Sequence, residues 1–550
     1  MKTTANKQKQ TLTFVSIGGL GEIGLNCYLY SSVLEGVSSN HILVDCGLGF
    51  KDNNIKSVDT FFPDIDFLIE NKIKISALLI THAHEDHIGA IPYLWEKLGC
   101  DIFATRFVAD VIMSKLKDNP VSGKLKINIV DHLKEYKIGD FQVTWCPVVH
   151  SIPDSNLLLI KHSSCNLVHT GDFKVDESIT SITYLKKLAK EGIKYLICDS
   201  TNVLEEDIKA KEEGIIKDLS NIINTAKGRV FITLFSSNLF RLNNILNIAK
   251  KTKRKVVFIG RSLENYSQIG EKHGYIDLKN IISQDDIKNH ADKNLLIVVT
   301  GSQGEERSTF YNMLVTGNSR YSLSKEDTVI FSSKVIPGNE TRISKLYNEI
   351  SRLGANLFTS NDSNIHVSGH PSRKDLKIMY NLIKPEYIIP MHGETLHLRK
   401  HYDFAISQGY KSKMLTVGDV LELSTEKPEI KDAIPVGKIC YDGNRLVSSQ
   451  EQFLKDRGKM HYNGVVTIVL SFKNNYLENI DLDILGLVSQ QELAIEKKQI
   501  IKKIYTVVDN ILKFKDVKES TIKEETKRTI NRYFKDFFDK RPIISIFLTY

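Results

Sequence analysis

Short apolar runs alternate with turn residues over the first 215 residues of the chain. Strands are predicted here at residues 41–47, 75–80, 141–149, 166–172 and 194–200. The spacing of apolar residues predicts helices at 87–98 and 106–117. Several of these strands end in Asp or His and lead into a loop. This pattern is typical of a layered α/β domain whose functional site lies at the strand ends.

A different pattern begins at about residue 216 and continues to about residue 360. The strands predicted in it are apolar throughout and cover residues 228–235, 254–260, 294–301 and 327–333. Helices are predicted between them, for example at 238–251 and 341–353. Continuous apolar strands separated by helices indicate a parallel sheet covered on both faces. We therefore expect residues 216–360 to form an inserted domain.

The first pattern returns over residues 361–447, which we expect to complete the domain begun by residues 1–215. A helix is predicted there at 373–384, between strands at 364–370 and 386–394. A polar linker is expected at 448–460. Residues 461–550 predict a small C-terminal α/β domain, with strands at 464–472 and 542–550 and helices at 491–513 and 519–538.

The composition changes this picture little. With 550 residues the chain has room for several domains, and 41% apolar and 25% charged residues are ordinary for a globular protein. These values exclude a collagen-like, disulfide-scaffold or mainly disordered chain. The net charge of +8 permits a polyanionic partner without requiring one.

The cysteines and the apolar runs bear on location. The seven cysteines are widely spaced and form no CxxC motif, so we expect buried free thiols in a reducing compartment. No run approaches the ~18 apolar residues that a membrane-spanning helix needs. We therefore expect a cytoplasmic protein without a membrane partner.

One glycine motif suggests a nucleotide site but lacks the expected context. Gly19, Gly21 and Gly24 match GxGxxG, and Asp45 follows about 20 residues later. The residues after the glycines are strand-like, so no helix N-terminus is available to bind a pyrophosphate. We therefore do not expect nucleotide binding here.

The densest candidate chemistry is THAHEDH at residues 81–87, directly after a predicted strand. Imidazole and carboxylate groups without thiolates suit zinc, or alternatively manganese. A solvated polar loop is the opposing interpretation, but so many ligands in one short loop favour metal. Other strand ends add ligands at His150, Asp172 and His392. Together they predict a dinuclear site, which could polarise a phosphoryl or acyl oxygen.

These motifs resemble those of known families. HxHxDH at 82–87, followed by His150 and Asp172 and preceded by Asp45, resembles the metal-ligand series of the metallo-β-lactamase fold. DSTN (199–202), HVSGH (366–370) and PMHGE (390–394) resemble the added motifs of the β-CASP nucleases. GGLGEIGLN, GSQGE, FSSKVIPGNE and KDRGKM resemble bacterial ribonuclease J, from about residue 12 to the last strand. The resemblance implies a metallo-β-lactamase αββα sandwich, an inserted β-CASP parallel α/β domain and a small C-terminal α/β domain.

The resemblance also implies roles for individual residues. One zinc would be held by His82, His84 and His150, the other by Asp86, His87 and His392, with Asp172 bridging the two. Asp45 would support the metal-bound water or orient ligands from behind. Manganese is the alternative metal. The implied catalytic residues are Asp86, Asp172, Asp199 and His370. The His370 imidazole would bind the scissile phosphate or protonate the leaving oxygen.

Substrate contacts are expected in two loops. The first is HVSGH, that is His366, Val367, Ser368, Gly369 and His370, whose small residues let a backbone approach closely. The second follows an apolar strand and contains Ser236, Ser237 and Asn238; the alternative there is a helix cap. For His397 and His401, on a predicted helix, we favour a solvated face over extra metal ligands.

The function predicted from these motifs is metal-dependent hydrolysis of RNA phosphodiesters. The resemblance implies both 5′-to-3′ exonuclease and endonuclease action, in rRNA processing and mRNA decay, on single-stranded RNA. It also implies a homodimer or homotetramer formed through the C-terminal domain. Three alternatives stay open: a β-CASP DNA nuclease, a small-molecule hydrolase of the same fold, and a non-catalytic RNA-binding scaffold.

Overall fold

The structure is a computed structural model of the 550-residue chain, and it contains two compact units that are described separately. The larger comprises Met1–Phe50 and Thr60–Ile439, and the smaller comprises Lys51–Asp59 and Cys440–Tyr550. The residues described are 10–550 except 35–36, 50–54, 56–57, 59, 120–122, 176–180, 208–211, 318–320, 337, 424–425 and 515.

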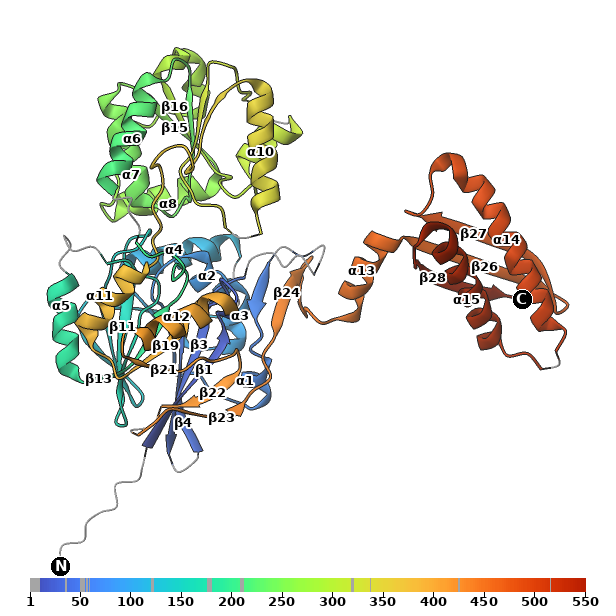
Figure 1. Ribbon diagram of the computed structural model, residues 1–550, viewed down its shortest axis with the longest axis horizontal. Helices are drawn as coiled ribbons and strands as arrows, with labels where there is room; N and C mark the ends of the chain where they lie inside the picture. Colours follow the sequence, from blue (N-terminus) through green and yellow to red (C-terminus); the bar gives the residue numbers. More distant parts are fainter. Residues whose placement is uncertain are drawn as a thin grey trace, which may run out of the picture. The chain divides into compact units, whose positions relative to one another are not determined.

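Two sheets form the base of the larger unit (Figure 1). The eight-stranded sheet has the order β23 (Glu429–Ala433), β22 (Asp419–Glu422), β1 (Gln10–Gly18), β3 (Cys27–Leu34), β4 (Val37–Val44), β6 (Ala77–Leu79), β7 (Asp101–Ala104), β8 (Ile127–Ile129). The seven-stranded sheet has the order β21 (Lys411–Ser412), β19 (Tyr387–Met391), β13 (Ile193–Asp199), β12 (Asn166–His169), β11 (Asn156–Lys161), β10 (Phe141–Pro147), β9 (Glu135–Ile138).

The core lies between these two sheets. Phe14 and Tyr30 of the first sheet pack in one buried cluster with Trp145, Leu158 and Ile197 of the second. The outer face of the seven-stranded sheet is covered by α5 (Ser181–Leu188), α11 (Arg373–Ile383) and α12 (Thr395–Ser407). On the opposite side lie α1 (Asp66–Glu70) and α3 (Ile91–Leu98) (Figure 1). The predicted αββα sandwich is therefore confirmed.

The helix predicted at 87–98 is in fact two helices. α2 (Glu85–Ile88) ends at Gly89, and α3 begins at Ile91 with Pro92 in its first turn. Proline lacks a backbone N–H and therefore suits a helix start better than a helix interior. The break leaves the residues before Gly89 as a short turn of their own, next to the metal-ligand candidates.

The inserted domain is a five-stranded parallel sheet, as its apolar strands predicted. Its order is β15 (Lys255–Ile259), β16 (Leu295–Val299), β14 (Val230–Thr233), β17 (Thr328–Phe331), β18 (Asn356–Phe358). It is accompanied by α6 (Glu212–Thr225), α7 (Leu239–Lys251), α8 (Arg261–Lys272) and α10 (Glu340–Leu353) (Figure 1). The helix α6 runs across the predicted domain boundary at residues 215 and 216.

The strand predicted at residues 364–370 is wrong, because this segment is an irregular loop. Its carbonyl groups are used by side chains rather than by a neighbouring strand. Ile365 O accepts hydrogen bonds from Arg241 Nη1 at 2.9 Å and from Ser332 Oγ at 2.6 Å. Asn202 Nδ2 donates to His370 O at 3.2 Å. Such local side-chain bonds compete with a strand ladder.

The smaller unit contains a three-stranded sheet with β26 (Val465–Lys473) at its centre. β27 (Tyr476–Leu485) pairs with it antiparallel and β28 (Ile543–Thr549) pairs with it parallel. Helices α14 (Gln490–Leu512) and α15 (Glu519–Phe538) pack on one face of this sheet. Most of the predicted linker is helical, as α13 (Gln452–Asn463). Among the residues that the structure describes, no helix combines the length and apolar character needed to cross a membrane.

Candidate metal centre

The predicted ligands come together at the ends of the sandwich strands. Parallel pairing of β12 with β13 and of β13 with β19 brings the carboxyl ends of these strands to one edge. The loops that leave this edge, and the loops after β6 and β10, carry the candidate ligands. These are His82, His84, Asp86, His87, His150, Asp172 and His392.

Three imidazoles converge in the first group. His84 Nδ1 lies 3.1 Å from His82 Nε2 and 3.0 Å from His150 Nε2. His150 Nδ1 lies 2.8 Å from Gly369 O, which can only accept a hydrogen bond. His150 Nδ1 must therefore carry the proton, which leaves a lone pair on Nε2. Nitrogen lone pairs directed at one point are the arrangement that a cation stabilises.

Asp45 lies behind both histidine groups. This buried carboxylate accepts hydrogen bonds from Thr81 N and Thr81 Oγ1, each at 2.8 Å, and from His87 Nδ1 at 2.7 Å. Since Thr81 Oγ1 donates to Asp45, its oxygen accepts from His82 Nδ1 at 3.0 Å. With Nδ1 donating in each ring, the Nε2 atoms of His82 and His87 carry the lone pairs that a metal would bind.

Asp172 lies between the two groups. Its Oδ2 atom is 3.6 Å from His82 Nε2, 3.7 Å from His150 Nε2 and 3.2 Å from His87 Nε2. Its Oδ1 atom is 2.8 Å from His392 Nδ1. In the second group His392 Nε2 approaches Asp86 Oδ2 at 3.3 Å. A carboxylate in this position can contact ions in both groups.

The residues present fit divalent cations. The ligand atoms of His82, His84, His150 and Asp172 lie within 4.8 Å of one another, and so do those of Asp86, His87, Asp172 and His392. Asp172 Oδ2 and His392 Nε2 are buried without a hydrogen-bond partner among the described residues. A buried polar atom left unpaired costs about 1–3 kcal/mol, which a bound cation would offset.

Electrostatics divides the histidines into two kinds. Burial lowers the pKa of His82 and His84 well below the ordinary value and lowers that of His150 to about 4. These imidazoles are neutral at pH 7, the form that binds a metal. Burial would also lower the pKa of His392, but Asp172 and Asp86 raise it to about 10. Against the effect of burial, the carboxylates of Asp172 and Asp86 likewise raise the pKa of His87 in the second group, so they dominate the electrostatics there.

Asp199 and His370 adjoin the centre from the β-CASP motifs. His370 Nδ1 lies 2.9 Å from Asp199 Oδ2 and 3.7 Å from Asp172 Oδ2. Thr201 N and Thr201 Oγ1 donate to Asp199 Oδ1 at 2.8 and 2.7 Å. The His370 side chain remains 23% exposed, so the far edge of its ring can reach a substrate.

The two predicted substrate loops have different surroundings. Gly369 of HVSGH touches His150 directly, and an added Cβ atom would lie 2.7 Å from His150 Nδ1. Asn202 Nδ2 donates to Ser368 Oγ at 2.6 Å. In the other loop, Asn238 Oδ1 accepts from Arg241 N at 3.0 Å and so caps α7, the alternative considered above. Ser236 Oγ lies 3.0 Å from Ser262 Oγ.

The favoured interpretation of His401 as part of a solvated helix face is wrong. His401 is fully buried, and its Nδ1 and Nε2 atoms lie 2.8 Å from Ser200 Oγ and 2.5 Å from Tyr380 OH. His397 is half-buried, and its Nδ1 atom has no hydrogen-bond partner in the described part of the chain. Neither histidine is in a metal-ligand cluster there.

Sequence reasoning missed several residues that support the site. Arg241 is buried. It donates two hydrogen bonds of 2.8 and 2.9 Å to Glu212 and one to Ile365 O, just before HVSGH. Asn26 Nδ2 lies 3.1 Å from His87 Nε2. Tyr266 OH donates to Ala83 O at 3.2 Å. Only Asn26, the last residue of GGLGEIGLN, lay in a motif quoted from the sequence.

Comparison with known families matches four segments of the chain. They are the metallo-beta-lactamase superfamily at 24–261, the ribonuclease J beta-CASP domain at 227–350, the Zn-dependent metallo-hydrolase RNA specificity domain at 362–412 and the ribonuclease J C-terminal domain at 452–549. Ribonuclease J of Sinorhizobium meliloti is 31% identical over 98% of each chain. The chain belongs to the ribonuclease J family.

Other ribonuclease J proteins are also similar over nearly all of this chain. That of Helicobacter pylori strain B128 is 31% identical over 98% of this chain and 79% of its own. Ribonuclease J2 of Bacillus subtilis is 28% identical over 98% of each chain. A crystal structure of a protein of unknown function from Enterococcus faecalis V583 has a TM-score of 0.54 at 16% identity, covering 76% of this chain and 100% of its own. That last likeness concerns the fold alone.

Proposed function

We propose that the chain is a metal-dependent ribonuclease that hydrolyses phosphodiester bonds of single-stranded RNA. The observation that carries the proposal is the pair of ligand groups that share Asp172, whose buried Oδ2 atom has no hydrogen-bond partner among the described residues. Membership of the ribonuclease J family supports RNA as the substrate. Intact ligand groups argue against a scaffold that only binds RNA.

Two zinc ions per chain are proposed, with manganese as the alternative. His82, His84 and His150 would hold one ion, and Asp86, His87 and His392 the other, with Asp172 shared. When bound, two such ions polarise a phosphoryl oxygen and lower the pKa of water. Asp45 keeps the His82 and His87 rings turned so that Nε2 faces the ions.

His370 would act on the substrate phosphate. Burial alone would lower the pKa of His370, but the charges of Asp199 and Asp172 raise it above the ordinary value. A protonated imidazole held through Nδ1 by Asp199 can donate from Nε2 to a phosphate oxygen or to the leaving oxygen. Ser368, Gly369, Ser236 and Ser237 would contact the RNA backbone nearby. Such backbone contacts make binding dependent on salt.

Activity is tested with matched single-stranded RNA and DNA oligonucleotides and with a circular RNA. We expect RNA hydrolysis that stops with a chelator and returns with zinc or manganese. Release of mononucleotides from 5′-monophosphorylated RNA shows exonuclease action, and cleavage of the circle shows endonuclease action. We expect both. Preferential cleavage of DNA, or hydrolysis of small esters alone, would contradict the proposal.

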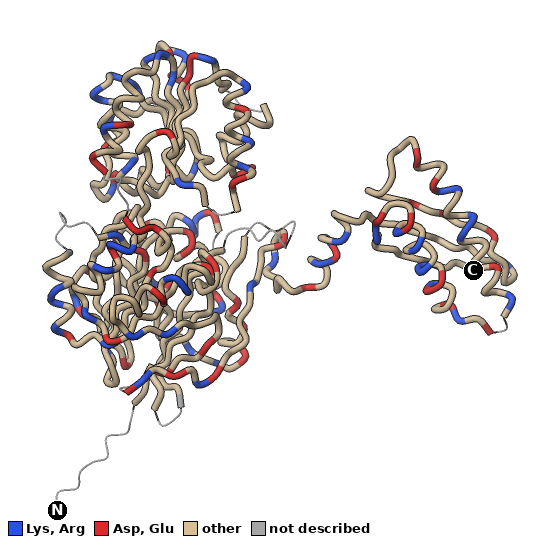
Figure 2. Tube along the Cα trace, viewed as in Figure 1, with Lys and Arg blue, Asp and Glu red and all other residues tan. Residues whose placement is uncertain are grey.

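Self-association is proposed through the smaller unit. The sheet face opposite α14 and α15 exposes Leu485, which pairs with Val465, at 60%, and Phe547, which pairs with Val469, at 55%. Acidic and basic residues are mixed along both helices, which gives no single-sign surface for RNA (Figure 2). Sedimentation should show a dimer or tetramer that Phe547→Glu dissociates, while Ile495→Glu, at an exposed position of α14 on the other side of the sheet, should not. An unchanged assembly in Phe547→Glu would contradict the proposal.

The thiols support a cytoplasmic location. All seven cysteines are free, and six of them are buried. Free thiols persist in reducing compartments, where disulfides are rare.

A further inference from the structure

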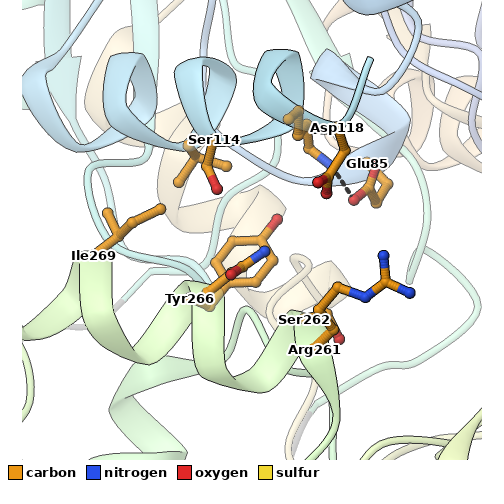
Figure 3. A pocket seen from close by; sticks show the side chains of 10 residues that line it. Glu85, Ser114, Asp118, Arg261, Ser262, Tyr266 and Ile269 are labelled. Atoms are coloured by element: carbon orange, nitrogen blue, oxygen red, sulfur yellow. Dashed lines mark hydrogen bonds and ion pairs between the residues drawn. The ribbon is translucent and has the colours of Figure 1, made fainter.

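A cavity of about 260 Å³ opens between α4 (Arg106–Asp118) of the sandwich and α8 of the inserted domain (Figure 3). This volume lies just below the usual range of small-molecule sites. It is therefore of a size for one nucleoside rather than for a length of chain. None of the metal-ligand candidates lines it.

The cavity adjoins the proposed path of the RNA on two sides. Glu85, in its wall, stands between the ligand candidates His84 and Asp86. Ser262, also in its wall, lies 3.0 Å from Ser236 of the second substrate loop through their Oγ atoms. Tyr266 OH anchors α8 to the metal-binding loop through Ala83 O. A nucleotide in the cavity would therefore neighbour the scissile bond.

The walls differ from one end of the cavity to the other. Val111, Ile269 and the Tyr266 ring are apolar, and flat apolar and aromatic surfaces are what nucleobases pack on. Asn265 also lines the cavity, and its amide can offer hydrogen bonds to a base edge. This part suits a base.

The other end is charged with both signs. Glu85 and Asp118 lie on the α4 side, and Arg261 lies on the α8 side (Figure 3). Glu85 is paired with Lys115, but no ion pair joins Arg261 to either carboxylate among the described residues. The guanidinium is thus available to a phosphate, and the carboxylates can accept hydrogen bonds from ribose hydroxyls.

We propose that this cavity binds one nucleotide of the RNA substrate next to the scissile phosphate, with the base between α4 and α8, the phosphate on Arg261 and the ribose hydroxyls on Glu85 and Asp118. The inference rests on the proposed ribonuclease function and deepens it. It supplies a contact to the 2′-hydroxyl, which distinguishes RNA from DNA.

Binding of uncleavable phosphorothioate oligonucleotides to the full-length, metal-loaded protein tests this. Each position of a single-stranded RNA is replaced in turn by an abasic nucleotide and by a 2′-deoxynucleotide. For the wild type, an abasic replacement at one position should raise Kd about ten- to hundredfold, and a 2′-deoxy replacement at the same position should raise Kd by a smaller factor. Ser114→Trp, which fills the cavity, should raise Kd for the intact RNA and abolish the abasic penalty at that position.

Arg261→Gln should weaken binding and reduce the slope of log Kd against log salt by about one. Arg352→Ala, on α10 of the same domain, is the matched control and should change neither quantity. If the abasic penalties of wild type and Ser114→Trp agree at every position, the cavity holds no base and the inference is overturned. Binding is measured without cleavage. Absence of ribonuclease activity would therefore contradict the proposed function, while the binding data would still test the cavity.

Discussion

The imidazole of His370 is bound to the carboxylate of Asp199 through a contact of 2.9 Å between Nδ1 and Oδ2. The two residues are 171 positions apart in the sequence, on either side of the inserted domain. Asp199 is buried, whereas the His370 side chain is 23% exposed. The buried acid therefore orients a histidine that can reach the substrate.

We predict that Asp199→Asn lowers kcat for RNA about hundredfold, since a positioned acid–base group typically contributes 10²–10⁴-fold. The amide keeps the size of the side chain but loses the charge that favours the imidazolium. Steady-state kinetics with circular dichroism as a folding check measures this. Asp403→Asn, an exposed acid paired with Arg399, is the control. Equal kcat values for the two variants would refute a role for the Asp199–His370 pair.

Metal content should depend differently on two of the ligands. Asp172 belongs to both ligand groups, whereas His84 belongs to one. Asp172→Ala should therefore lose most of both ions, and His84→Ala should retain about one ion per chain. Elemental mass spectrometry of the purified variants gives the ratio, with exposed His132→Ala as the control. Two ions retained in Asp172→Ala would show that this carboxylate is not shared.

Gly369→Ala should impair activity through His150. An added Cβ atom would lie 2.7 Å from His150 Nδ1 and 3.0 Å from Ser151 N, closer than atoms can pack. The ring or the HVSGH loop must shift, and losing such support of a ligand typically costs 10–100-fold in metal affinity or activity. Gly214→Ala, where the new atom meets nothing within 4 Å, should keep full activity. Normal activity of Gly369→Ala would show that the HVSGH loop does not support His150 in the metal centre.

Stability should depend on pH through His401. Burial lowers the pKa of His401 to about 3, below its unfolded value near 6.5. Between these values the unfolded chain binds a proton that the folded chain does not, so this residue destabilises the fold as pH falls from about 6.5. The slope approaches ~1.4 kcal/mol per pH unit.

Urea unfolding of wild type and His401→Gln at pH 7, 6 and 5 measures the difference. The free energy of unfolding should fall more steeply with decreasing pH for the wild type. Parallel pH dependence of the two proteins would mean that His401 is accessible to protons in the folded state.

The sequence was sufficient for the parts of the fold that follow from local pattern. Continuous apolar strands such as 294–301 predicted the parallel sheet, and the dense ligands of 82–87 predicted the cluster that the strand ends bring together. The predictions that were wrong concerned segments whose structure depends on contacts with residues far away in the sequence. The sequence of residues 364–370 has the pattern of a strand. In the structure, however, Arg241 and Ser332 donate hydrogen bonds to the carbonyl oxygen of Ile365, and the segment is a loop.

Burial was the other quantity that local pattern could not provide. His401 lies on a helix with polar neighbours, and only the tertiary fold places Tyr380 of α11 and Ser200, at the end of β13, beside its ring. For the same reason, the sequence pattern does not predict the cavity between α4 and α8. Ser114 and Arg261 are unremarkable positions in their own helices and form a site only where α4 meets α8.

The central claim is that two ions held by the histidine–aspartate cluster make this chain a ribonuclease. Metal-depleted protein is titrated with zinc or manganese, and RNA hydrolysis is measured against ions bound per chain. We predict negligible hydrolysis without metal and a rise that reaches its maximum at two ions per chain. Full hydrolysis by the metal-depleted protein, or none with two ions bound, would contradict it.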